Sequence, residues 1–238
     1  VVTNGNNCKD SITRSITIRS LPTADAGLDV TICNEDTAQI GSANNTDYSY
    51  AWNNGTSLTS DNISNPKAFP STTTSYTVTV TEKTTGCTTT DVVTVTVNQL
   101  PAADAGLDVT ICDTDSAQLG SSNNAGYTYA WDNGITLSNA SISNPKAGPS
   151  ITTTYTVTVT ETSTGCTETD EVIVNVNSLP AVSFTYSDTC FNSSTQFTNT
   201  TVGVSSQVWD FGDGVGTSTQ SNPTYTYSSI GIYDVKLI

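Results

Sequence analysis

A repeat of 79 residues constrains this chain more than any other feature of its sequence. Residues 22–100 and 101–179 align without a gap and share 53 identical positions. Each copy has one Trp, one early Cys and one late Cys. The aligned pairs include Pro22 and Pro101, Cys33 and Cys112, Trp52 and Trp131, and Cys87 and Cys166. A repeat of this length predicts one folded unit per period, with the units in tandem.

The register of the repeat extends in both directions. Residues 1–21 align with residues 80–100, so they are predicted to be the C-terminal hairpin of a preceding repeat. From about residue 181 the offset becomes 78, which places Cys190 on Cys112 and Trp209 on Trp131. Residues 180–238 are therefore predicted to form a further unit that stops before its last strand. We expect the 238 residues to be a window on a longer repetitive protein.

Short β segments separated by turn residues fill each repeat. In 101–179 we expect strands at 108–112, 117–120, 127–132, 154–161 and 169–177, with a weak pair between 135 and 147. Val alternates with Thr in the last two, which is typical of strands with one buried and one solvated face. About seven short strands around a central Trp predict an immunoglobulin-like sandwich. The expected fold is all-β, with the core tryptophans Trp52, Trp131 and Trp209.

The charge balance and the missing histidine exclude several function classes. The chain has 22 acidic and 7 basic side chains, a net charge of −15 and no His. Such a surface does not favour nucleic acid or an anionic membrane, and no run of 18 apolar residues predicts insertion into a bilayer. The usual general base is missing, as are zinc-ligand spacings and a phosphate-binding loop. We therefore predict that the chain is not an enzyme.

The six cysteines fit an oxidising compartment, and three pairings respect the repeat. Pairing within repeats gives Cys33–Cys87 and Cys112–Cys166. Pairing of sequence neighbours gives Cys8–Cys33, Cys87–Cys112 and Cys166–Cys190. The third scheme joins an early Cys to the late Cys of the next repeat, as Cys33–Cys166, and leaves Cys8 and Cys190 with partners outside these residues. In an immunoglobulin-like sandwich the turn after the first strand, with the early Cys, and the last hairpin turn, with the late Cys, lie at opposite ends. A strand of eight residues spans about 26 Å, whereas bridged Cα atoms lie within about 7 Å. The third scheme is therefore favoured, and the first stays as its alternative.

Acidic residues suggest a second kind of site. Asp25 and Asp29, and again Asp104 and Asp108, lie beside the expected junctions between repeats. Their hard oxygen atoms suit Ca²⁺, the one cofactor that the sequence suggests. The alternative is that these side chains cap turns. Asp210 and Asp213 are predicted to organise a tight turn.

Two motifs carry a resemblance to a known family. "WDFGDG" at 209–214, followed by "NPTYTYSSIGIYDVKL", closely resembles the PKD domain, an immunoglobulin-like sandwich common on bacterial surfaces. "ADAGLDVTIC" with the following Trp, "NP", "TYTVTVT" and "GC" resembles the PKD-like repeats of giant Bacteroidetes cell-surface adhesins, nearest to gliding-motility adhesins of the SprB type. The resemblance covers essentially the whole chain. It implies secretion by the type 9 system, extracellular display, and a rod of tandem domains.

The leading expectation is a structural and adhesive segment of such a surface protein, forming a stiff stalk or filament. Its partners would be neighbouring repeats, and either surface polysaccharide or other copies in a filament. The alternative is an accessory carbohydrate-binding array of a secreted polysaccharide-degrading enzyme, with Tyr48, Tyr50, Tyr127 and Tyr129 stacking on sugars. The Thr ladder as an ice-binding face is disfavoured because sandwich sheets twist. Ser11, Thr37 and Ser116 resemble the Bacteroidetes O-glycosylation signal of Asp, Ser or Thr, and an apolar residue.

Overall fold

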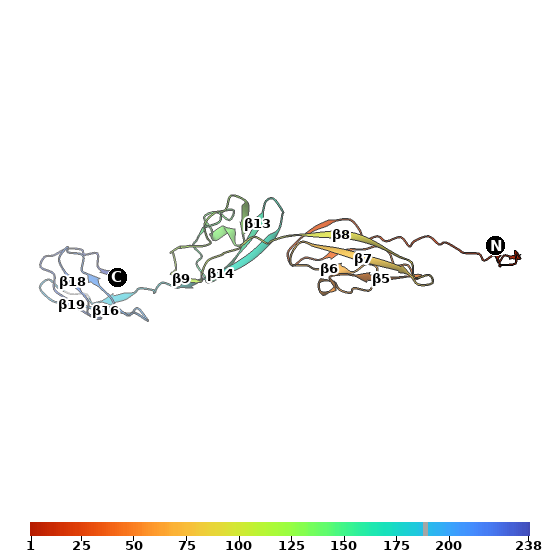
Figure 1. The fold of residues 1–238 in the computed structure, drawn as a ribbon. Helices are drawn as coiled ribbons and strands as arrows, with labels where there is room; N and C mark the ends of the chain where they lie inside the picture. Colours follow the sequence, from red (N-terminus) through yellow and green to blue (C-terminus); the bar gives the residue numbers. More distant parts are fainter. Residues whose placement is uncertain (188–189) are drawn as a thin grey trace.

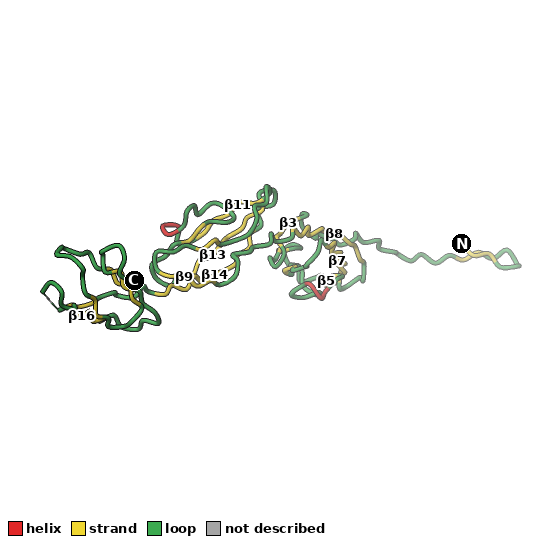
Figure 2. The backbone as a smooth tube through the Cα atoms, turned by 90° about the vertical axis from the view of Figure 1, so that its left-hand side faces the viewer, coloured by secondary structure: helices red, strands yellow, loops and turns green. Residues whose placement is uncertain are grey.

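The computed structural model describes residues 1–187 and 190–238. Three folded units follow one another in chain order between the two termini (Figure 1). We call them the first sandwich (β3–β8), the second sandwich (β9–β14) and the C-terminal unit (β15–β20). Apart from two short 3₁₀ helices, the regular structure in these residues is all strand (Figure 2). No helix in the part that the structure describes is long and apolar enough to cross a membrane.

The first sandwich contains a four-stranded sheet with the order β3-β8-β7-β5, and a two-stranded sheet of β4 and β6. β3 pairs in parallel with the end of β8, and the other pairs are antiparallel. The bounds are Val30–Cys33 for β3, Ala38–Gln39 for β4, Tyr48–Trp52 for β5, Gly55–Ser57 for the 3₁₀ helix η1, Lys67–Ala68 for β6, Thr74–Glu82 for β7, and Thr88–Asn98 for β8.

The second sandwich repeats this topology strand for strand, with the order β11-β13-β14-β9 and the pair β10-β12. The bounds are Val109–Cys112 for β9, Ala117–Gln118 for β10, Tyr127–Trp131 for β11, Gly134–Thr136 for η2, Lys146–Ala147 for β12, Thr153–Glu161 for β13, and Thr167–Asn177 for β14. The strands expected from the sequence are confirmed within a few residues. The weak pair expected between 135 and 147 is confirmed as a single antiparallel bridge of Leu137 with Ala147. The residues just before it form the helix η2, which starts after Asn133 in a left-handed conformation and was not expected.

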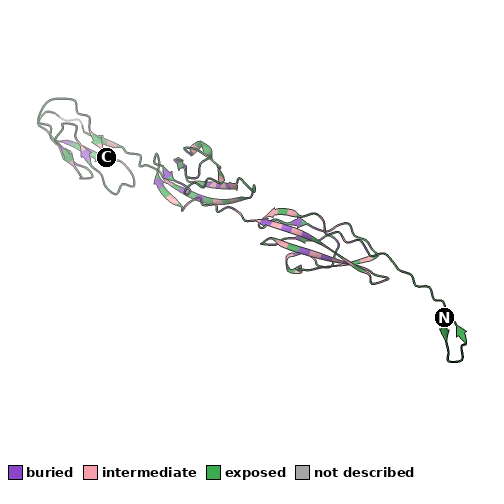
Figure 3. Ribbon diagram, turned by 45° about the horizontal axis from the view of Figure 1, so that its top comes forward, coloured by how far each residue is buried: buried purple, intermediate pink, exposed green. Residues whose placement is uncertain are grey.

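Val packs inward and Thr lies outward on the long hairpins, as the alternation predicts. On β7, Tyr76, Val78 and Val80 are buried, and the Thr residues between them are half-buried. Buried positions alternate with less buried ones along the strands in Figure 3. Trp52 lies in the same core, and its indole N–H donates to the carbonyl of Ile63 at 2.8 Å. Burial of the ring with its polar atom satisfied explains why one Trp recurs in each repeat.

The C-terminal unit keeps the Trp but has shorter strands. The bounds are Phe184–Tyr186 for β15, Thr195–Asn199 for β16, Trp209–Asp210 for β17, Thr217–Ser218 for β18, Thr224–Tyr225 for β19, and Lys236–Leu237 for β20. They form two three-stranded sheets, β15-β16-β19 and β18-β17-β20. Its core is aromatic, with Phe197, Trp209 and Phe211 almost fully buried.

The predicted tight turn in "WDFGDG" is confirmed. Asp210 Oδ1 accepts from the N–H of Gly212 at 2.9 Å, and Asp213 Oδ1 accepts from the N–H of Gly216 at 2.7 Å. The hydroxyl of Tyr225 donates to Asp213 Oδ2 at 2.5 Å. This hydrogen bond lowers the pKa of Asp213 and raises the pKa of Tyr225 to about 12. The turn is therefore held by a charged acceptor and a neutral phenol.

The N-terminal residues form only the tip of the predicted hairpin. β1 (Val2–Thr3) pairs with β2 (Lys9–Asp10), and residues 11–21 form no strand. Figure 3 shows this segment as exposed from the hairpin to the first sandwich. The physical reason is that a two-stranded hairpin has no sheet to pack against here, and such hairpins are marginal in water.

Candidate junction between the two sandwiches

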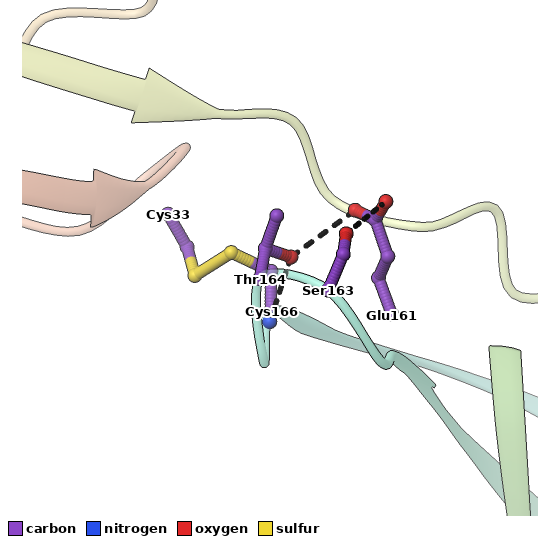
Figure 4. The surroundings of a disulfide bond; sticks show 5 residues. All are labelled: Cys33, Glu161, Ser163, Thr164 and Cys166. Carbon is purple, nitrogen blue, oxygen red and sulfur yellow. Dashed lines mark hydrogen bonds between the residues drawn. A yellow bond between two sulfur atoms is a disulfide. The ribbon is translucent and has the colours of Figure 1, made fainter. Parts of the chain in front are cut away.

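A disulfide joins the first sandwich to the second. Cys33 at the end of β3 is bonded to Cys166, which lies in the turn between β13 and β14 (Figure 4). Their Cα atoms are 5.7 Å apart, although 133 residues separate them in sequence. This is the pairing of an early Cys with the late Cys of the next repeat. In the described residues, Cys8, Cys87, Cys112 and Cys190 are free thiols.

Parallel pairing of β3 with β8 places Cys33 at this junction. Cys33 lies opposite Asn98, the last residue of β8, so it is at the end where the chain leaves the first sandwich. The N–H of Asn34 donates to the carbonyl of Asn98 at 2.7 Å and continues the ladder. Cys87 precedes the 11 residues of β8, a run of about 37 Å at roughly 3.4 Å per residue. A bond within the repeat is therefore out of reach.

A hydrogen-bonded turn holds Cys166. The N–H of Glu161 donates to the carbonyl of Cys166 at 2.9 Å, and Gly165 has a φ of +75°, a conformation that glycine adopts without strain. The Glu161 carboxylate accepts from the hydroxyls of Ser163 at 3.0 Å and Thr164 at 3.1 Å (Figure 4). Cys166 is only 1% exposed. The thiol is thus presented by a rigid turn, which lowers the entropic cost of closing the bridge.

The two cysteine positions of this disulfide recur as free thiols at the outer ends of the two sandwiches. Cys112 lies opposite Asn177 at the end of β14, as Cys33 lies opposite Asn98, and it is exposed. Cys87 follows a turn in which the Glu82 carboxylate accepts from the hydroxyls of Thr84 and Thr85, and these bonds lower the pKa of Glu82. Each sandwich therefore has an early-Cys end and a late-Cys end.

The predicted metal ligands take part in hydrogen bonds. Asp25 Oδ1 accepts from the N–H of Gly27 at 3.0 Å, and Asp29 Oδ1 accepts from the N–H of Thr94 on β8 at 2.8 Å. Asp104 and Asp108 make the same two bonds in the second repeat. Across residues 1–187 and 190–238, no three or more His, Cys, Asp or Glu side chains form a group that would hold a metal ion. These contacts are those of turn-capping carboxylates; Ca²⁺ at the junctions stays a prediction.

Two aspartates that the sequence reasoning missed anchor the start of each sandwich. Asp91 Oδ2 accepts from the N–H of Ala26 at 2.8 Å, and Asp170 does the same for Ala105 at 2.8 Å. Both Ala side chains are fully buried. The signal was an Asp at the same position in both copies, directly before the Val-rich end of the last strand. These bonds fix the segment that follows the linker and so limit the freedom of the junction.

The remaining predicted residues lie on the surface or pack on the cores. Ser11, Thr37 and Ser116 are exposed, and Thr37 and Ser116 follow the turns after Cys33 and Cys112. Tyr48 and Tyr50 are half-buried against the core, and the hydroxyl of Tyr50 accepts from the N–H of Asn45 at 2.9 Å. Tyr127 and Tyr129 behave in the same way in the second sandwich. The four Tyr therefore do not form an open aromatic row.

Comparison with known proteins finds a family match in the last part of the chain. Residues 180–238 match the family model described as the PKD domain. No curated protein matched the chain in a sequence comparison. Among solved structures, titin domains I67–I69 in a Glu-to-Ala variant are 6% identical with a TM-score of 0.35, covering 90% of this chain and 85% of that one. Extracellular domains 3–5 of Drosophila OTK are 9% identical with a TM-score of 0.27, covering 80% of this chain and 78% of that one.

Proposed function

We propose that the chain is a load-bearing segment of an extracellular, cell-surface filament, in which tandem sandwiches form a stiff stalk for adhesion or gliding. One observation carries the proposal: the disulfide between Cys33 and Cys166 bridges two sandwiches that the peptide chain already connects. Two covalent connections across one junction restrain bending and rotation more than a single linker does. A bond that stiffens an array has little use in a chain whose units act separately.

The bridge also reroutes tension. A pull on the N-terminal side reaches Cys33 through β3, crosses to Cys166 and continues through β14. Residues 34–165, which contain most of both sandwiches, lie inside the closed loop and carry no net load. β3 and β14 are already extended, so they have little length to give. The geometry suits a protein that must keep its length under shear, as at a cell surface.

The acidic surface and the exposed hydroxyl residues agree with this setting. A net charge of −15 keeps long arrays soluble and apart. Display at the surface through type 9 secretion, and sugars on Ser11, Thr37 and Ser116, belong to the same proposal. An accessory carbohydrate-binding array is the second candidate, but the packing of Tyr48 and Tyr50 against the core gives it no open aromatic platform.

Small-angle X-ray scattering tests the stiffness directly. The oxidised chain is compared with the double variant Cys33→Ser/Cys166→Ser, and Cys8→Ser serves as a matched control because Cys8 is exposed and free. We expect the maximum dimension of the double variant to broaden into a range of bent conformers, while the control keeps the oxidised profile. Identical profiles for all three would remove the stiffening role. Antibody labelling of intact cells tests display at the surface.

A further inference from the structure

A polar cavity lies in the first sandwich beside the edge strand β5. Its volume is about 450 Å³, which is within the range of roughly 300–1,000 Å³ of small-molecule pockets. The loop before β5, the strand itself, the segment 62–65 and the turn after β7 contribute to its walls. The polar residues that line it include Asn44, Tyr48, Tyr50, Asn62, Asn65 and Lys83.

Hydrogen bonds join the loop before β5 to the turn after β7 and leave side-chain donors unused. Lys83 Nζ donates to the carbonyl of Thr46 at 2.7 Å, and the N–H of Lys83 donates to the carbonyl of Asp47 at 2.9 Å. An ammonium group has three protons, so two of them remain for a ligand. The hydroxyl of Tyr50 accepts from the N–H of Asn45 at 2.9 Å and keeps its own proton to donate. The cation is therefore held in place before any ligand arrives.

The segment 62–65 is fixed as well. The indole N–H of Trp52 donates to the carbonyl of Ile63 at 2.8 Å and ties the segment to the end of β5. Asn62 Oδ1 accepts from the hydroxyl of Ser60 at 2.8 Å. This bond uses the oxygen of the Asn62 amide and leaves its NH₂ group as a donor. Walls held in this way reduce the entropy that is lost when a ligand binds.

The openness of this position does not depend on what precedes the sandwich. The second sandwich has the first one bonded in front of it through the junction disulfide, yet Ser141, which corresponds to Asn62, is exposed as well. Ile142 is 38% exposed, and its counterpart Ile63 is 41% exposed. A preceding sandwich therefore leaves this position accessible.

Two substitutions distinguish this cavity from the same place in the second sandwich. Lys83 and Asn62 of the first sandwich correspond to Thr162 and Ser141 of the second. The hydroxyl of Thr162 donates to the carbonyl of Gly126 at 2.8 Å, so it replaces the loop contact of Lys83 and brings no charge. The second sandwich is therefore a natural control, with the same frame, one amide fewer and no cation at this place.

We propose that this cavity binds a sugar residue that bears a carboxylate, namely a hexuronate unit of an acidic polysaccharide. None of the described residues that line it is acidic, in a chain with 22 acidic and 7 basic side chains. The Lys83 ammonium forms a charge-assisted hydrogen bond to the carboxylate. The amides of Asn44 and Asn62 donate and accept at once, as neighbouring ring hydroxyls require, and the half-buried Tyr48 and Tyr50 contribute hydroxyls without an open ring face. The proposal rests on the adhesive role proposed above and gives it a ligand class.

A nuclear magnetic resonance titration of the full chain tests the site. The probes are glucuronate and its neutral counterpart glucose, at an ionic strength of about 0.15 M, where a Debye length of about 8 Å screens the distant carboxylates of the chain. We expect glucuronate to shift the amide signals of residues 44–50, 62–65 and 83 with saturation at one site. Glucose should bind about tenfold more weakly, because it lacks the charge-assisted hydrogen bond. Equal affinity for the two sugars, no shift with glucuronate, or the same shifts in residues 123–129 and 141–144 would overturn the proposal.

Exchange of the two distinguishing residues separates a sugar site from a merely charged surface. Lys83→Thr copies the second sandwich, so it should keep its melting temperature and lose about tenfold in glucuronate affinity, and retained affinity would contradict the role of the ammonium. The variant Ser141→Asn/Thr162→Lys should gain a second glucuronate site. Triglutamate is a carboxylate probe without a sugar ring, and binding at this cavity as tight as that of glucuronate would refute the sugar assignment. The scattering test of the Cys33–Cys166 junction does not depend on this site, so a loss of sugar binding and a loss of stiffness are distinguishable.

Discussion

Breaking the Cys33–Cys166 bond should lengthen the chain greatly under force. The bond closes a loop of 133 residues across a Cα–Cα distance of only 5.7 Å. Since an extended chain reaches about 3.6 Å per residue, opening this loop releases about 480 Å. Nearly all of that length is added to the end-to-end extension of the chain, because the closed loop contributes almost nothing to the distance between the chain ends.

Single-molecule force spectroscopy measures this length. We expect the oxidised chain to show no large unfolding step from either sandwich, because most of both lies in the closed loop and only β3 and β14 lie on the loaded path. The variant Cys33→Ser/Cys166→Ser should show two added steps, one for each separate core, that sum to the predicted release. The C-terminal unit lies outside the loop and gives an internal reference step in both proteins.

The control is Cys8→Ser, which leaves the loop intact. It should behave as the oxidised chain does. Reductant added to the oxidised chain should reproduce the double variant within one pulling series. The reasoning is refuted if oxidised chain and double variant release the same length, because tension then passes through the sandwiches despite the bond.

Four further outcomes follow from the structure. Gly41→Ala should lower the melting temperature of the first sandwich by about 10 °C or more, because the residue has a φ of +77° and a Cβ would lie 2.0 Å from the carbonyl oxygen of Ser64. Gly86→Ala, with the same sign of φ and open space around the Cβ, is the control in calorimetry. Thr114→Gly should stabilise the second sandwich by about 1 kcal/mol in urea unfolding, since a β-branched residue at a φ of +78° is strained. The pKa of Glu82 is lowered in the folded protein, so its contribution to stability is present above the unfolded value near 4.5 and is lost as the pH falls through the folded pKa. Glu82→Gln should therefore remove this decrease when the melting temperature is measured as a function of pH. EDTA tests the predicted Ca²⁺ at the junctions: removal of a bound ion should lower the melting temperature, whereas aspartates that only cap turns through their backbone N–H bonds should leave it unchanged.

Much of the fold was readable from the sequence because the repeat supplies two copies of each signal. Val and Thr alternate on β7 and β8, and only an extended chain places such residues on opposite faces. The same alternation appears at the same positions on β13 and β14. Trp131 was assigned to a core for its size, and it is 6% exposed. Side-chain size and periodicity are local properties, so the sequence is sufficient for them.

The junction was less readable because it depends on pairing between distant strands. Cys33 belongs at the far end of its sandwich only because β3 runs parallel to the end of β8, and no local pattern distinguishes a parallel from an antiparallel partner. The roles of Asp91 and Asp170 depend on the same docking, because each reaches a backbone N–H that lies 65 residues away in sequence. The 3₁₀ helices were missed because they follow a single Asn in a left-handed conformation.

The cysteine positions also determine how an array of such repeats would carry load. If the early Cys of every unit bonds the late Cys of the next, successive closed loops overlap, since Cys112 lies inside the loop that Cys33 and Cys166 close. Between Cys166 and the next bridge, which starts at Cys190, only the residues from 166 to 190 carry the tension. Those residues include β14 and the following linker, so each bridge bypasses most of two sandwiches. An array built in this way gains extensional strength from covalent bonds and keeps most of each sandwich outside the loaded path.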